Sequence, residues 1–271
     1  MLIASPLLVA CKARYSAAQG AGRLRFSTGL HMIPHPDKRA KGGEDAAFAG
    51  ERLLVAADGV GGWAEQGVDP ALYSRSLVEH VARLFGADEE KYLAAPKALV
   101  ADAAARVTAQ GSSTLVLATL SADGTLRTAN VGDSGYMVLR AREPQRFELQ
   151  FKSSEQTHGF NFPYQLGSHG DRPDCAQAAQ HVLARDDVVV LGSDGLFDNM
   201  TAQEVAAVVE DCAREGPLVA AAVARRVAET AQRHAENPAR DSPFALNARK
   251  AGLHYRGGKV DDITVVVGRV V

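Results

Sequence analysis

Three apolar segments of this sequence each adjoin an aspartate. Residues 53–59 run through five apolar residues to Asp58 and a glycine, residues 188–194 end at Asp194, and residues 261–267 begin with Asp261. Short apolar runs bounded by turn residues predict buried strands. Carboxylates gathered at strand ends would form a pocket rich in oxygen ligands and negative charge. Such a pocket suits hard divalent cations, so we expect Mg²⁺ or Mn²⁺.

Further acids stand in similar contexts, namely Glu44–Asp45 and Asp133. Clustered carboxylates raise one another's pKa, and a bound divalent cation removes that cost. Zinc is disfavoured because none of the eight histidines forms a ligand-spaced pair near these acids. Because no side-chain nucleophile motif is apparent, the chemistry points to an attacking water molecule activated by metal.

One competing interpretation is a dinucleotide-binding loop. Residues 59–64 fit the pattern G-x-G-x-x-A after a strand, and Glu79 lies at a suitable distance. Asp58 would place a negative charge beside the pyrophosphate, however. The break at Asp69–Pro70 separates the glycines from the next helix, and Glu79 falls inside a helical pattern. These three features argue against nucleotide binding.

The elements that must position the acids alternate between strands and helices. Asp123–Gly124 predicts a two-residue hairpin, and Thr201 with Glu204 predicts a capped helix start. Residues 153–185 and 237–258 are expected to be loops, the first of them a functional loop that shapes substrate choice. Strands are expected at 46–49, 53–57, 113–121, 125–131, 136–140, 147–151, 186–191 and 263–267, and helices at 71–85, 96–110, from 202 and at 217–235. This order predicts an α+β fold with a mostly antiparallel sheet core and helices outside.

Composition narrows the function classes. The chain has 271 residues, 46% of them hydrophobic, and can bury a sizeable core. Its formal net charge of -2 provides no field that would recruit nucleic acid, and no segment approaches the length of a membrane-spanning helix, so neither nucleic-acid binding nor stable membrane insertion is expected. Three scattered cysteines exclude a disulfide framework and fit a reducing compartment.

The N-terminal residues differ from the rest. The first acid is Asp37, and the segment before it is basic and contains Ser, Ala and Gly. That composition is typical of an organellar transit peptide. We therefore expect a disordered import segment over residues 1–30, a single domain over residues 31–271, and a mitochondrial location with the chloroplast as the alternative. A signal sequence over residues 2–9, a lipoprotein site at Cys11 and an untargeted tail are competing interpretations.

Six short motifs resemble, in order, those of the metal-dependent type 2C Ser/Thr protein phosphatases (the PPM family). The similarity extends over residues 31–271, and residues 35–38, 60–63, 162–166, 242–245 and 256–259 resemble the mitochondrial branch of that family. The motifs are Gly43–Asp45, Ala57–Gly62, Gly111–Thr114, Asn130–Ser134, Gly192–Asn199 and Asp261–Val265.

This resemblance implies a central antiparallel β-sandwich flanked by helices on both faces, a four-layer αββα arrangement. It implies two Mg²⁺ or Mn²⁺ ions at one end, with a bridging water that attacks phosphorus, and a weaker third ion. Phosphorylated proteins are the implied substrates, and a monomer is expected. By the family pattern, Asp58 bridges both metals and forms the catalytic centre with Asp194. The remaining implied ligands are Glu44, the Gly59 carbonyl, Asp261 and, for the third ion, Asp133.

Two departures from the family pattern bear on mechanism. Val60 stands where many members have a histidine that can serve as a general acid, and valine donates no proton. The phosphate-binding arginine has no clear counterpart, and Lys41 is the first choice for that role, with Arg39 second. The alternatives to a protein phosphatase are a pseudo-phosphatase that acts as a binding module and a phosphatase of small phosphorylated metabolites.

Overall fold

Two five-stranded antiparallel sheets form the centre of the molecule. The structure, a computed structural model, describes residues 23–143 and 145–271. One sheet has the order β1-β14-β13-β7-β8, with β1 (Phe26–Ile33), β14 (Ile263–Val270), β13 (Val188–Gly192), β7 (Gly135–Glu143) and β8 (Arg146–Lys152). The other has the order β12-β6-β5-β3-β2, with β12 (Gln177–Val182), β6 (Thr125–Val131), β5 (Leu115–Leu120), β3 (Leu53–Ala57) and β2 (Ala46–Ala49).

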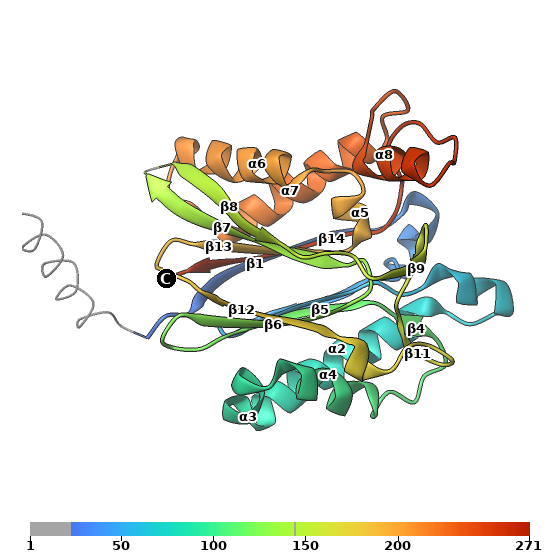
Figure 1. Cartoon of the computed structure of the whole chain (residues 1–271), viewed down its shortest axis with the longest axis horizontal. Helices are drawn as coiled ribbons and strands as arrows, with labels where there is room; N and C mark the ends of the chain where they lie inside the picture. The colour runs from blue at the N-terminus through green and yellow to red at the C-terminus, as the bar shows by residue number, and fades with distance from the viewer. Residues whose placement is uncertain (1–22, 144) are drawn as a thin grey trace, which may run out of the picture.

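Helices cover the outer face of each sheet (Figure 1). The first sheet carries α6 (Ala202–Glu215) and α7 (Ala220–Ala235), and the second carries α2 (Pro70–Ala87), α3 (Glu89–Ala94) and α4 (Pro96–Ala104). This arrangement confirms the expected four-layer αββα fold. None of the helices in the described part of the chain has the length and apolar character needed to cross a membrane.

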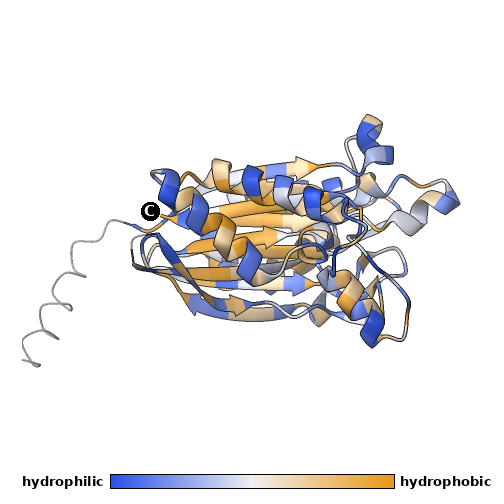
Figure 2. Cartoon of the chain, turned by 90° about the horizontal axis from the view of Figure 1, so that it is seen from above, coloured by the Kyte–Doolittle hydropathy of each residue, from blue (hydrophilic) through white to orange (hydrophobic). Residues whose placement is uncertain are grey.

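The apolar strands are buried on both faces, which explains why they lack a polar–apolar alternation. In β13, Val188 and Val190 pack under the helices, whereas Val189 and Leu191 lie in the core between the sheets. In Figure 2 these strands form an orange band beneath helices whose outer faces are hydrophilic. A strand covered on both sides must be apolar at every position, so its hydropathy alone identifies it as central.

Local signals set several element boundaries. Gly124 adopts φ +88° in the hairpin between β5 and β6, where Leu120 pairs with Leu126. Thr201 caps α6, accepting a hydrogen bond from the Glu204 amide while the Glu204 carboxylate accepts one from the Thr201 amide. The expected hairpin and capping box are both confirmed.

The shorter elements gather at the end of the sandwich opposite the C-terminus (Figure 1). They follow or precede the strand ends that carry the acids, and they therefore form the rim of the candidate site. They are η2 (Pro36–Lys41), η3 (Gly61–Gln66), β4 (Ser112–Ser113), β9 (Thr157–Gly159), β10 (Phe162–Pro163), β11 (Leu166–Gly167), η4 (Pro173–Cys175), α5 (Asp194–Phe197) and α8 (Pro243–Lys250).

Four sequence-based assignments were wrong. Strand β1 begins at Phe26, which is only 2% exposed, so residues 26–30 are folded with the domain and not disordered as expected. The expected loops contain regular elements, because 153–185 includes the edge strand β12 and 237–258 includes α8. The helix expected to reach residue 110 ends at Ala104. Residues 1–22, which carry most of the predicted import segment, lie outside the described residues.

Candidate metal centre

Asp58 lies directly after β3, at the middle of a group of acids. Its amide donates to the Thr114 hydroxyl at 3.2 Å, while its carbonyl accepts from the Thr114 amide at 2.9 Å. These two contacts fix the backbone at the point where the strand leaves the sheet. The pKa of the Asp58 carboxyl is raised well above its usual range, first by burial and then by the nearby charges of Asp45, Asp194 and Asp261. The structure thus brings the predicted bridging residue together with acids from three other segments.

Glu44 and Gly59 lie side by side, as the resemblance implied. A Cβ atom at Gly59 would lie 2.6 Å from the Glu44 carbonyl oxygen and 2.8 Å from that of Pro70, so no larger residue fits this contact. A Cβ atom at Gly61 would lie 3.2 Å from Glu44 Oε2, which places the carboxylate against the same glycine-rich turn. The glycines after Asp58 therefore allow the Glu44 segment to approach, which is a packing role.

Asp194 is the first residue of α5 and is buried, with 8% of its surface exposed. Its Oδ2 atom accepts a hydrogen bond from Lys259 Nζ, which also donates to Asp198 Oδ2 at 2.9 Å. Burial would raise the pKa of Asp194, but the Lys259 ammonium group holds it below its usual value. Asp194 is therefore an ionised carboxylate with one oxygen engaged by lysine.

Asp261 and Asp262 are adjacent but do different things. Asp262 is buried, and its two oxygens accept hydrogen bonds from the backbone amides of His35 at 2.7 Å and Glu44 at 2.8 Å. Asp261 is partly buried, and its carboxylate lies 3.3 Å from Lys259 Nζ and 3.8 Å from Lys38 Nζ. Asp262 thus ties the N-terminal segment to β14, whereas Asp261 faces the acid group.

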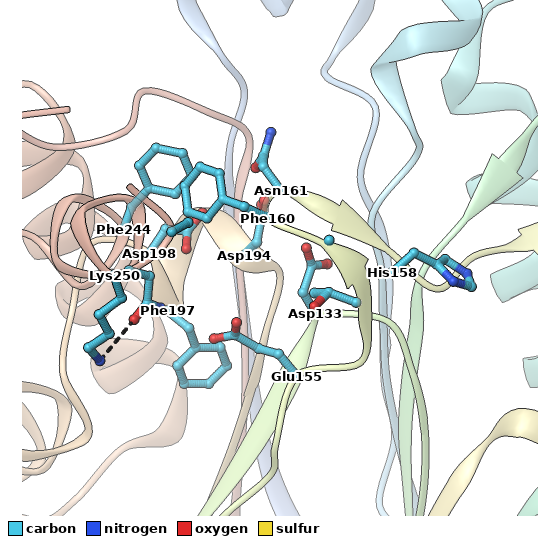
Figure 3. A pocket seen from close by; sticks show the side chains of 14 residues that line it. Asp133, Glu155, His158, Phe160, Asn161, Asp194, Phe197, Asp198, Phe244 and Lys250 are labelled. Atoms are coloured by element: carbon cyan, nitrogen blue, oxygen red, sulfur yellow. Dashed lines mark hydrogen bonds between the residues drawn. The ribbon is translucent and has the colours of Figure 1, made fainter. Parts of the chain in front are cut away.

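Asp133 contributes to a neighbouring cavity of about 450 Å³. Figure 3 shows Asp133 and Glu155 on one side of this cavity and Asp194 and Asp198 on the other, with Phe160 nearby. Burial, reinforced by the charges of Asp194 and Asp198, raises the pKa of Asp133 to about 8. Asp198 and Glu155 were not predicted as site residues, although Asp198 stands four residues after Asp194, one helical turn away.

A set of unpartnered oxygens indicates that the site is built for cations. Asp45 Oδ1, Asp133 Oδ1 and Asp194 Oδ1 are buried and accept no hydrogen bond from any residue that the structure describes. Burial raises the pKa of Asp45 to about 7, even though the Thr264 hydroxyl donates to its other oxygen at 2.6 Å. Unpartnered buried carboxylate oxygens are costly unless a cation neutralises them, so these residues fit Mg²⁺ or Mn²⁺.

Within residues 23–143 and 145–271, no three acidic, histidine or cysteine side chains converge closely enough to hold an ion as they stand. Two lysines, Lys38 and Lys259, lie among the acids and pair with their carboxylates. Metal ligation therefore requires carboxylates to turn away from lysine or to use their unpartnered oxygens.

The phosphate-binding residues predicted from sequence do not face the acid group. Arg39 and Lys41 are exposed, and in the part of the chain that the structure describes neither side chain forms an ion pair. Lys38 is the residue of η2 that turns inward, with Nζ 2.6 Å from Glu44 Oε2 and 3.5 Å from Asp262 Oδ2. The basic run 38–41 was the only sequence signal, and it could not identify which of its members points inward.

The aromatic residues of the predicted functional loop line the rim. Phe160 packs against Phe244 of α8, with ring centroids 5.0 Å apart. Phe162 is 54% exposed, so its side chain does not fill the core. His158 lines the cavity through its backbone, while its ring points away and stacks on Tyr164 at 4.1 Å (Figure 3).

Comparison with known proteins places these observations in a family. A family model described as "Protein phosphatase 2C" matches residues 171–238. The Arabidopsis thaliana protein "Probable protein phosphatase 2C 26" is 39% identical over 92% of this chain and 85% of its own length. "Probable protein phosphatase 2C 55" from the same plant is 42% identical over 91% of this chain, which spans 52% of that relative's length.

A solved structure agrees with these relatives. The X-ray structure of the photosystem II phosphatase PBCP superposes with a TM-score of 0.81 at 36% identity and covers 91% of this chain and 99% of its own. A second structure, of the PstP serine/threonine phosphatase catalytic domain with two manganese ions, shares the fold with a TM-score of 0.64 at 23% identity. With identity above 35% over nearly the whole of a relative and the same four-layer fold, the chain belongs to the protein phosphatase 2C family of Ser/Thr protein phosphatases.

Proposed function

We propose that this chain hydrolyses phosphoserine and phosphothreonine in proteins, that it needs two Mg²⁺ or Mn²⁺ ions to do so, and that it works in mitochondria. The observation that carries the catalytic proposal is the group of unpartnered, buried carboxylate oxygens on Asp45, Asp133 and Asp194. The two manganese ions named for the PstP structure support the same metal class. Bound ions would lower the pKa of a water molecule and stabilise the charge of the phosphate.

Different acidic residues of the chain would bind the ions and position the ligands. Asp58, Asp194 and Asp261 would hold the ions, with Glu44 and the Gly59 carbonyl at the opposite side of the turn. Asp262 positions Glu44 through its amide, at 2.8 Å. No side chain at position 60 can protonate the leaving group, so substrates with a good leaving group, such as aryl phosphates, should be cleaved more readily than the alkyl ester of phosphoserine.

We further propose that Lys38, in place of Lys41 or Arg39, contacts the phosphate. Burial would lower its pKa, but the hydrogen bond to Glu44 and the charges of Asp261 and Asp262 raise it above the usual value. Lys38 therefore stays an ammonium group and serves as a point charge, not as a proton donor. Lys38→Met should raise KM for a phosphopeptide about tenfold or more, whereas the matched Lys41→Met should leave it within about twofold. Equal effects of the two substitutions would contradict this assignment.

The catalytic proposal is tested by hydrolysis of a phosphopeptide and of an aryl phosphate, each with Mn²⁺, Mg²⁺ and EDTA. We expect turnover of both with either metal and none in EDTA. Binding of the phosphopeptide without turnover of either substrate would favour the pseudo-phosphatase alternative. Turnover of small phosphate esters alone would favour a metabolite phosphatase.

The location is proposed from the composition of the N-terminal segment, which is acid-free before Asp37. The name of the similar photosystem II phosphatase supports the chloroplast as the alternative. Residues 1–25 fused to a fluorescent protein should direct it to mitochondria, and replacing Lys12 and Arg14 with glutamine should weaken that import. A chain starting at Arg23 should keep full activity because it retains β1. Cytosolic fluorescence of the fusion would contradict the import proposal without affecting the catalytic one.

A further inference from the structure

Lys259 lies among the acids as a fully engaged cation. Its Nζ atom contacts Asp198 Oδ2 at 2.9 Å and Asp261 Oδ2 at 3.3 Å, and it donates to Asp194 Oδ2. Two of the three N–H donors of this ammonium group therefore bond to Asp194 and Asp198, and Asp261 adds an ion pair. The Phe244 ring lies 5.0 Å away on another side, and the side chain is only 15% exposed. The lysine is therefore surrounded by negative groups and shielded from water.

The backbone of Lys259 is held in place independently of these ion pairs. The buried Asn199 side chain accepts a hydrogen bond from the Lys259 amide at 2.9 Å and donates to the Lys259 carbonyl at 2.8 Å. A Cβ atom at the preceding Gly258 would lie 2.1 Å from the His234 carbonyl oxygen, so the chain there packs directly on α7. A lysine anchored at both its backbone and its charge is a built part of the site and not a surface side chain that folded inward.

Two of the three carboxylates that Lys259 engages line the cavity where a third ion would bind. Asp194 and Asp198 line that cavity together with Asp133, the residue implied for a weaker third metal. Both carry charge close enough to Asp133 to raise its pKa. An additional cation held by Asp133 would therefore share Asp194 or Asp198 with the lysine and would be repelled by its positive charge.

The two oxygens of Asp194 can bind two different cations, a lysine and a metal ion. Oδ2 is engaged by Lys259, whereas Oδ1 is buried and unpartnered. A carboxylate can thus keep its lysine on one oxygen and offer the other to a metal ion. Together Lys38 and Lys259 also carry the same charge as one divalent cation, so the acids around them need one ion fewer for neutrality.

We infer that Lys259 is a built-in cation that replaces the third metal ion, so that this phosphatase binds two divalent ions and not three. The inference rests on the proposed metal centre. It predicts that the cavity beside Asp133 admits a divalent ion only when the lysine charge is removed.

The test counts Mn²⁺ ions bound per folded chain by calorimetry and by elemental analysis after dialysis. The native protein should bind two, and Lys259→Met, which keeps the length of the side chain and removes its charge, should bind three. Asp198→Asn added to that variant should return the count to two. The matched control is Lys250→Met, because Lys250 lines the same cavity but bonds only to Asn247, at 3.3 Å, among the described residues. Its count should remain two.

The outcomes separate this inference from the proposed function. A native count of zero would overturn the metal centre itself, whereas a native count of three would overturn only the role of Lys259. A Lys259→Met protein that folds, as judged by circular dichroism, and still binds two ions also overturns it. If that variant does not fold, Asp198→Asn in the native background decides. An unchanged count of two supports Asp198 as the partner of the lysine, and a reduced count contradicts it.

Discussion

The different roles of Asp261 and Asp262 yield a sharp prediction for Asp262→Ala. Asp262 is buried, and each of its oxygens accepts a backbone amide, from His35 at 2.7 Å and from Glu44 at 2.8 Å. Hydrogen bonds to charged groups contribute about 1.5–3 kcal/mol each, so losing both should lower the free energy of unfolding by about 3–6 kcal/mol. For a domain of this size the melting temperature should fall by on the order of 10 °C.

The loss should already be complete without metal, because these two bonds belong to the fold. In Mn²⁺ it should be at least as large, because Asp262 also holds the amide of Glu44, a proposed metal ligand. Asp261→Asn is the matched control. Its carboxylate makes ion pairs of 3.3 and 3.8 Å with two lysines, and the neighbouring acids repel it. It also accepts the Asp262 amide at 2.9 Å, a bond that the asparagine oxygen can keep. In EDTA this variant should lie within about 1 kcal/mol of the native protein. In Mn²⁺ it should lack most of the stabilisation that bound metal provides.

Urea unfolding in EDTA and in saturating Mn²⁺, followed by circular dichroism, measures the free energy of unfolding of each variant and of the native protein in both conditions. Asp262→Asn adds a graded check, since one remaining oxygen can accept one of the two amides and should restore part of the loss. The reasoning would be refuted if Asp262→Ala unfolded within about 1 kcal/mol of the native protein in EDTA. It would also be refuted if Asp261→Asn kept the full stabilisation that Mn²⁺ gives to the native protein.

Three further predictions follow from the site. Asp194→Asn should lower turnover at saturating Mn²⁺ by about a hundredfold or more while the fold survives, because it removes a buried ligand charge; near-native turnover would contradict a ligand role. Gly195→Ala should unfold the protein or abolish activity, because its Cβ atom would lie 2.1 Å from the Asp262 carbonyl oxygen. The control Gly86→Ala, whose Cβ atom would have no neighbour within 4 Å, should stabilise α2 by about 0.5–1 kcal/mol. Thermal melts of the two variants test this pair of predictions. In EDTA the free energy of unfolding should fall as the pH rises from about 4 to 8. The folded-state pKa values of Asp45 and Asp133, about 7 and about 8, exceed the unfolded value of 3.8. In this pH range the native state therefore binds protons that the unfolded chain has released. Saturating Mn²⁺ should weaken or reverse that trend, and urea unfolding at a series of pH values measures it.

The acids could be found from the sequence because their signal is local. An apolar run followed by Asp and Gly identifies both a buried strand and the residue at its end, so Asp58 and Asp194 were predicted without knowledge of the fold. The hairpin at Gly124 and the cap at Thr201 are local in the same sense, since a turn or cap depends on a few neighbouring residues.

The elements that were missed depend on distant contacts. Strand β1 pairs with β14, with Phe26 opposite Val270. Only Phe26 and Gly29 of this strand are buried, so its sequence lacks the apolar run that identifies the central strands. Lys38 faces the acids only because Asp262, more than 200 residues later, holds the segment around Glu44. The start of α8 did carry a local signal, with Ser242 as the N-cap and Pro243 in the first turn, but it was masked by the polar residues around it.

The position of β14 in its sheet has a consequence for biosynthesis. β14 lies between β1 and β13, so the first sheet cannot close until residues 263–270 have been synthesised. Asp261 and Asp262 directly precede β14, and before they are available the Glu44 segment lacks its bond to Asp262. A nascent chain, or one terminated before β14, would therefore have neither a complete core nor a metal site, and it would expose apolar strand edges to chaperones or proteases. Catalytic competence would thus arise only after β14 has been synthesised, in a step that completes the fold and the site together.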